Sequence, residues 1–172
     1  GYVGDRMFWT SAGWGGLNGR ADFKNKGMPP HRWISLFGKE MKAWRNKPIV
    51  GMPVVGILGQ VPGDAALRGV DIDKWYQMTT RSILNQGYIA AFRPHPDRAP
   101  NFFPRGARIH RGTLDEFFDA CSWVVTYNSN SAVDAVLAGV PAVAVDEGSM
   151  AWAVTGRDPI TVPSQPDRRQ WA

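Results

Sequence analysis

The pattern of hydrophobic and polar positions changes near residue 50. Residues 1–50 are rich in glycine, tryptophan and basic side chains, and they show neither the alternation of a strand nor the period of a helix. We expect this segment to be irregular, with one short helix over residues 30–37. So many tryptophans need burial, so the segment should pack against another part of the molecule.

From residue 53 onward, short apolar runs alternate with amphipathic stretches. Apolar runs typical of buried strands are Val54–Gly59, Tyr88–Phe92, Trp123–Tyr127 and Ala142–Val145, with a shorter candidate at Ala107–His110. Apolar residues recur every three or four positions from Ile72 to Ile83, which predicts a helix with Asp71 as N-cap and Gly87 as its end.

Two more helices are expected in the second half of the chain. One covers Leu114–Ala120 and is capped by Thr113. The other is capped by Ser129 and ends at Gly139, as helices that stop at a glycine commonly do.

Strands that alternate with helices indicate βαβ units. The expected fold class is therefore α/β, a Rossmann-like parallel sheet with helices on both faces, formed by residues 51–172. Residues 1–50 are expected to form a separate irregular segment. Ligands of such sheets bind beyond the carboxyl ends of the strands, so the loops after the strands hold the candidate site residues.

The first two of these loops differ in character. Gln60, Gly63 and Asp64 follow the first strand and are candidate substrate-binding residues, although a plain turn is the alternative. This loop has neither the P-loop pattern nor the dinucleotide fingerprint. Arg93 and His95 follow the second strand in the stretch Arg-Pro-His-Pro, and they are the candidate catalytic residues. Arginine offers a fork of donors to phosphate and histidine can protonate a leaving group, whereas an exposed pair without function is the alternative.

Small polar residues follow the fourth strand and open the next helix. The four in a row are Asn128, Ser129, Asn130 and Ser131. The free N–H groups and the dipole of a helix start favour an anion, whereas capping alone would require one such residue. We expect all four to bind substrate.

Three acidic residues complete the set of candidate substrate-binding residues. Asp134, one turn into the helix, either complements the helix dipole or accepts the ribose hydroxyls of a nucleotide, and the pattern leaves both open. Asp146 and Glu147 follow the fifth strand, where they could accept sugar hydroxyls or simply form a turn.

Composition restricts the class of ligand and the cellular compartment that we expect for this chain. With 20 basic and 15 acidic residues the net charge is +5, which suits an anionic ligand such as a nucleotide, phosphate or DNA, or else a solvated basic surface.

Cys121 is the single cysteine of the chain, which excludes a disulfide framework and a Cys/His metal site and fits a reducing cytoplasm. We expect Cys121 to pack at a helix end. We find no signal peptide and no apolar run long enough for a transmembrane segment, so a cytoplasmic location is expected. The chain starts without Met at Gly1 and stops in a polar stretch at Ala172, so we expect truncation at one or both ends.

The segment from Asn128 to Pro141 resembles the donor-site segment of GT-B glycosyltransferases. In that family a small polar turn opens a helix, an acidic residue follows, and Gly-x-Pro ends the helix five residues after the acid. Asp134, Gly139 and Pro141 match this spacing, with Asp where the family usually has a ribose-binding Glu. Similar patterns occur in the peptidoglycan N-acetylglucosaminyltransferase and in non-hydrolysing UDP-N-acetylglucosamine 2-epimerases.

The stretch from Arg93 to Pro96 resembles the His-Pro motif of bacterial capsule polysaccharide transferases and polysialyltransferases. Those enzymes pair this motif with a serine-rich turn that binds donor phosphate, for which Ser129 and Ser131 are the candidates here. The resemblance covers residues 53–155, and residues 56–75 also resemble phage and bacterial glycosyltransferase-like proteins. It implies metal-independent transfer from a nucleotide-sugar donor that is a substrate, without a cofactor. The diphosphate would be held by Arg93, His95 and the helix N-terminus.

Several alternatives remain open at this point. The acceptor is unknown, with a glycan or modified DNA as candidates. Residues 1–50 could be the remnant of an acceptor domain, in which case Asp22 or His31 could supply a general base. The rival functions are a UDP-sugar 2-epimerase-like enzyme and a non-catalytic nucleotide- or nucleic-acid-binding module, in which tryptophans stack on bases.

Overall fold

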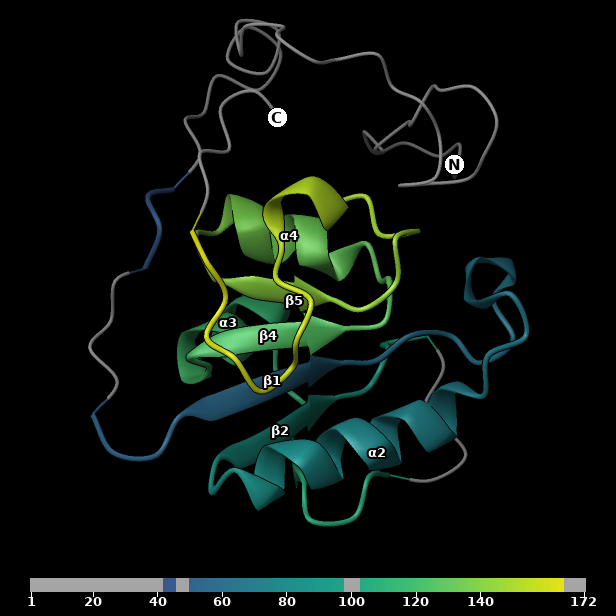
Figure 1. Ribbon diagram of the computed structural model, residues 1–172, viewed down its shortest axis with the longest axis horizontal. Coiled ribbons are helices and arrows are strands. Elements are labelled where there is room, and N and C mark those ends of the chain that lie inside the picture. The colour runs from purple at the N-terminus through teal and green to yellow at the C-terminus, as the bar shows by residue number, and fades with distance from the viewer. Residues whose placement is uncertain (1–41, 46–49, 98–102, 166–172) are drawn as a thin grey trace, which may run out of the picture.

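One parallel β-sheet forms the centre of the molecule. The computed structural model describes residues 42–45, 50–97 and 103–165 of the chain. The five strands have the order β3-β2-β1-β4-β5, and all four neighbouring pairs are parallel (Figure 1). Their bounds are β1 Val54–Leu58, β2 Ile89–Arg93, β3 Arg108–Ile109, β4 Trp123–Thr126 and β5 Ala142–Ala144. The predicted α/β fold class is confirmed.

Helices cover both faces of this sheet. Their bounds are α2 Ile72–Asn85, α3 Leu114–Ala120 and α4 Ser131–Leu137, with short 3₁₀ turns η2 Ala65–Leu67 and η3 Trp152–Val154. Helix α2 lies on one face, and α3 and α4 lie on the other (Figure 1). The chain runs outward from β1 to β3 and then returns to β4 on the opposite side of β1. The switch point at which such sheets bind ligands therefore lies between β1 and β4.

Alternate residues of each strand contribute to two separate cores. Ile57 and Phe92 pack with Tyr76 of α2 in one core. Leu58 and Val124 pack with Phe117 of α3 in the other. Because successive strand residues point to opposite faces, this alternation shows on which face each later residue of a strand lies.

The second core also buries the single cysteine. Cys121 is the C-cap residue of α3, and a Cβ added to Gly56 of β1 would overlap its sulfur and the Phe117 ring. Cys121 therefore packs at a helix end, as predicted. Burial raises the pKa of its thiol to about 12, which disfavours the reactive thiolate.

Most of the predicted helix ends are confirmed. Asp71 caps α2, with its carboxylate accepting the N–H of Lys74 at 3.0 Å. Thr113 caps α3 in a reciprocal capping box with Glu116. Beyond the C-caps of α2 and α4, Gly87 and Gly139 have φ of 75° and 77°, the left-handed conformation that favours glycine.

Several predicted boundaries at the carboxyl edge differ from the structure, and two of them bear on the candidate site. Strand β2 continues to Arg93, which is therefore its last residue and not part of the following loop. Helix α4 begins at Ser131 with Asn130 as N-cap, not Ser129, and Asn130 makes no side-chain cap bond. The Ser129 hydroxyl instead accepts the N–H of Ser131 at 3.2 Å within the preceding turn.

A short part of the N-terminal segment contacts the end of α4. The N–H of Arg45 donates to the Gly139 carbonyl at 2.7 Å, and Trp44 packs, partly buried, against the core of α3 and α4. The helix predicted over residues 30–37 lies outside the described residues, as do Asp22 and His31. Among the described helices, none is both long and apolar enough to cross a membrane.

Candidate functional site at the carboxyl edge of the sheet

The loops after β1 and β4 are joined by a pair of amide side chains at the switch point. The Gln60 side-chain carbonyl accepts the backbone N–H of Asn128 at 3.0 Å. The Gln60 side-chain amide donates to the Asn128 side-chain oxygen at 2.7 Å. The structure thus brings together two predicted site residues that are 68 positions apart in the chain.

This Gln60–Asn128 bridge extends to two further elements. The Asn128 amide donates to the Ala66 carbonyl at 2.9 Å and to the Asp146 carboxylate at 3.0 Å. The Tyr76 hydroxyl of α2 accepts the Gln60 N–H at 2.6 Å. Burial raises the pKa of Tyr76 above its usual range, so this hydroxyl stays protonated. The network therefore links α2 with the loops after β1, β4 and β5.

The bridge holds loops together and does not present open groups. Gln60 and Asn128 are only 7% and 2% exposed, and their side-chain amide groups are already hydrogen-bonded within the protein. Their predicted role in binding substrate remains a prediction. The geometry favours a positioning role, because buried and satisfied amides restrict the loops that they join.

Arg93 and His95 lie beside the end of β1, where glycine permits a close approach. The N–H of Gly59 donates to the Arg93 carbonyl at 2.8 Å. A Cβ on Gly59 would come within 2.8 Å of both the Arg93 oxygen and the His95 nitrogen. Any larger residue at this position would push the Arg-Pro-His backbone away from β1.

The two candidate catalytic side chains present donors at this edge. His95 is half-buried, and its Nδ1 accepts the N–H of Asp97 at 3.2 Å. In a neutral ring this leaves the proton on Nε2, which can donate to a ligand. Arg93 Nε is buried and has no hydrogen-bond partner among the described residues.

The polar turn before α4 is partly engaged with itself. The N–H of Ser129 donates to the Thr126 hydroxyl at 2.9 Å, and that of Ser131 donates to the Ser129 hydroxyl at 3.2 Å. Of the N–H groups expected to be free for an anion, those of Ser129 and Ser131 are therefore already engaged. Asn130 is exposed at the tip of the turn.

Two predicted residues of the first loop serve the turn that follows it. Asp64 is the N-cap of η2, and its carboxylate accepts the Ala66 N–H at 2.7 Å. Gly63 is exposed with φ of 78°, and nothing lies near its position for a Cβ. Asp64 borders the bridge through Ala66, whose carbonyl accepts from Asn128.

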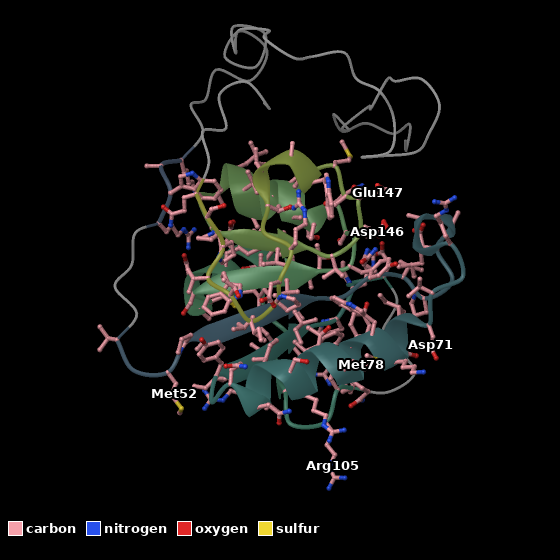
Figure 2. All side chains as sticks on the ribbon, in the orientation of Figure 1. Met52, Asp71, Met78, Arg105, Asp146 and Glu147 are labelled. Carbon is pink, nitrogen blue, oxygen red and sulfur yellow. The ribbon has the colours of Figure 1, made fainter. Side chains whose placement is uncertain are left out.

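The acidic candidates occupy different surroundings. Asp146 and Glu147 lie next to each other after β5 (Figure 2). Asp146 accepts from Asn128 and from the Gly148 N–H at 2.9 Å, whereas Glu147 is exposed. Asp134 is half-buried in the first turn of α4, and its pKa is raised by burial and by the charge of Asp115. Asp134 therefore lies toward the start of α3.

A groove on the surface lies away from the carboxyl edge of the sheet. A shallow groove of about 520 Å³ runs along the outer side of α2, where Figure 2 shows Met78 and Arg105. It is lined by Gln77, Met78, Arg81, Leu84, Asn85 and Arg105. Within the described ranges, no three His, Cys, Asp or Glu side chains gather closely enough to hold a metal ion.

Comparison with known proteins yields partial structural likenesses. No protein-family model matches the chain, and no curated protein matches it significantly. It is similar to KpsC, the beta Kdo 2,7 transferase of Thermosulfurimonas dismutans, at 20% identity and a TM-score of 0.49, over 67% of this chain and 39% of that one. It is also similar to the spinosyn rhamnosyltransferase SpnG at 19% identity and a TM-score of 0.42, over 66% and 30% of the two chains. The match thus spans well under half the length of either protein.

Proposed function

We propose that this chain is the nucleotide-sugar-binding domain of a GT-B type glycosyltransferase. One observation carries the proposal: the Arg93–His95 stretch and the polar turn at 128–131 flank β1 at one edge of one parallel sheet. The order of the two motifs along the chain, and the spacing of Asp134, Gly139 and Pro141, add support from the sequence.

In this proposal the donor diphosphate lies across the end of β1. Arg93 and the Nε2 of His95 donate to its oxygens and stabilise the negative charge that develops as the nucleotide leaves. The tip of the polar turn at Asn130 contributes from the other side, together with the hydroxyls of Ser129 and Ser131. No step of this mechanism requires a metal ion or a cofactor.

The remaining candidates orient the donor. Asp134 accepts hydrogen bonds from the ribose hydroxyls, and Asp146 and Glu147 accept them from the sugar. The Gln60–Asn128 bridge keeps the loops at a fixed separation, so that binding does not have to order them. The acceptor would be a glycan or modified DNA.

A thermal-shift panel of UDP-, GDP-, ADP-, dTDP- and CMP-sugars tests the proposal. We expect one nucleotide to raise the melting temperature of the wild type, and Asp134→Ala and Arg93→Ala to reduce that rise. Arg93→Ala should weaken binding of the same ligand by about tenfold, as expected for loss of a charge-assisted hydrogen bond of roughly 1.5 kcal/mol. Arg93→Ala should affect binding or turnover more than it affects unliganded stability.

Arg81→Ala is the matched control, because Arg81 is exposed on α2 and outside the site. It should leave the ligand-induced shift unchanged. A chain that responds to no nucleotide sugar, but binds single-stranded DNA with an affinity that falls steeply as salt rises, would contradict the proposal and favour a nucleic-acid-binding module.

A further inference from the structure

His110 extends the pairing of β3 by one residue and so comes beside Arg93. Phe92 of β2 is in register with Ile109 of β3, and the His110 N–H donates to the Phe92 carbonyl at 2.9 Å. Arg93 and His110 are the next residues on the two strands. They therefore occupy neighbouring positions at the carboxyl edge of the sheet.

Both side chains lie on the face of the sheet that α3 covers. Phe92 and Ile109 belong to the core beneath α2, and strand alternation turns the following residue of each strand to the opposite face. The His110 ring confirms this direction, since its centroid is 5.2 Å from that of Phe117 in α3. Arg93 and His110 thus form an adjacent basic pair on one face.

The two side chains share an unusual property. Arg93 Nε and His110 Nε2 are buried nitrogen atoms without a hydrogen-bond partner among the described residues. Buried polar atoms are nearly always paired, because leaving them unpaired costs free energy. Two unpaired nitrogens on neighbouring strand ends are explained if a ligand supplies the acceptor.

Gly112 borders both His110 and Glu116. A Cβ on Gly112 would overlap the Glu116 carboxylate and would lie 2.8 Å from His110 Nε2, so the two side chains border the same space. The nearby Glu116 carboxylate is already held by Thr113, accepting its N–H at 2.7 Å and its hydroxyl at 3.0 Å. Those two bonds lower the pKa of Glu116, and the charge of His110 lowers it further. No hydrogen bond joins Glu116 to His110 Nε2 among the described residues, so this nitrogen can still donate to another acceptor.

We infer that Arg93 and His110 together form a two-donor binding site for an anionic group. Identifying that group as the diphosphate of the donor rests on the proposed function. The anion would accept from Arg93 Nε and His110 Nε2, and so would lie beyond the ends of β2 and β3. His110 is thereby a binding residue that the sequence pattern did not single out.

Calorimetric titration with inorganic pyrophosphate tests this site directly. His110→Phe keeps the ring packed on Phe117 but removes Nε2, whereas Gly112→Ala keeps His110 and places a methyl group against both Nε2 and the Glu116 carboxylate. We expect both variants to bind pyrophosphate about tenfold more weakly than the wild type. His110→Gln should recover part of the affinity, because its amide can donate. Arg81→Gln removes one exposed charge from the opposite face and should change the affinity less than twofold.

The outcomes separate this inference from the proposed function. If the wild type does not bind pyrophosphate, or if His110→Phe and Gly112→Ala both bind it within twofold of the wild type, the inference is overturned. A nucleotide sugar that stabilises the wild type and both variants equally would overturn it while supporting the donor site. Pyrophosphate binding that both variants weaken, in a protein that no nucleotide sugar stabilises, would support the anion site and reject the transferase.

Discussion

Tyr76 shows how one side chain of the core reaches the candidate site. It belongs to the apolar stripe of α2 and is 1% exposed, yet its hydroxyl is hydrogen-bonded to the backbone of Gln60. The periodic pattern predicted the burial of Tyr76 but not this bond. A helical period reports which face is buried, and says nothing about the polar atom at the end of an aromatic side chain.

Replacing Tyr76 by Phe removes only a hydroxyl group, yet it should clearly lower the free energy of unfolding. Tyr76→Phe leaves the buried N–H of Gln60 without its acceptor at 2.6 Å, which should lower the free energy of unfolding by about 1–3 kcal/mol. Tyr88→Phe is the control, because the half-buried Tyr88 ring packs on Trp123 and should change stability by less than about 0.5 kcal/mol. Urea unfolding measures both. Equal losses would show that the bond to Gln60 contributes nothing.

Asp134 makes stability depend on pH in a defined direction. Burial, and secondarily the charge of Asp115, raises its pKa in the folded protein above the ordinary value of 3.8. The folded state therefore binds this proton more tightly than the unfolded chain does. As the pH rises from 3.8 to the folded pKa, the free energy of unfolding contributed by this group falls, and it stays lower at pH 7.

Asp134→Asn should accordingly raise the melting temperature at pH 7, because a neutral amide avoids the cost of the buried charge. The gain should shrink as the pH falls and vanish well below pH 3.8, where both states of the wild type are protonated. Glu147→Gln, at an exposed position, is the control and should show no such trend. Melting curves across this pH range measure the difference, and a gain at low pH would contradict the linkage.

At the scale of elements, the strands and most helix ends could be predicted from the local sequence. Asp71 and Thr113 cap the helices they were expected to cap, because a side-chain oxygen at that point accepts a helix N–H wherever the helix packs. The start of α4 was misplaced because Ser129 bonds within its own turn. The rule for parallel sheets predicts the edge at which a ligand binds, but the mutual bonding of Gln60 and Asn128 depends on tertiary contact across 68 residues. His110 was overlooked because β3 has only two residues and a weak apolar signal.

The close packing of β1 against the Arg-Pro-His stretch can be tested with one methyl group. Gly59→Ala should displace the backbone of Arg93 and His95, lowering the free energy of unfolding by about 1–3 kcal/mol and weakening pyrophosphate binding. Gly69→Ala is the control, since its φ of 80° costs an alanine about 1 kcal/mol while nothing lies near its Cβ. Urea unfolding and calorimetry distinguish the two, and equal pyrophosphate affinities would show that the contact does not position the site.

At the scale of the whole molecule, residues 42–45 contact the sheet domain at the end of α4. A Cβ on Gly139 would overlap the carbonyl of Ala43, so the segment at residues 42–45 passes directly over the end of this helix. Arg45 Nε donates to the Ala138 carbonyl at 3.2 Å, and its guanidinium pairs with Asp119 of α3. The glycine that the sequence identified as a helix end therefore also permits a contact between distant segments.

The two side-chain interactions of Arg45 should contribute differently to the free energy of unfolding. The pair with Asp119 lies at the surface, with the Asp119 side chain 65% exposed, so Asp119→Asn should lower the free energy of unfolding by less than about 1 kcal/mol. Arg45→Ala also removes a charged donor from the carbonyl end of α4, where cations are stabilised, and should cost about 2 kcal/mol. Urea unfolding of the two variants compares them directly. If both lose the same amount, the bond from Arg45 Nε to the Ala138 carbonyl contributes nothing beyond the ion pair.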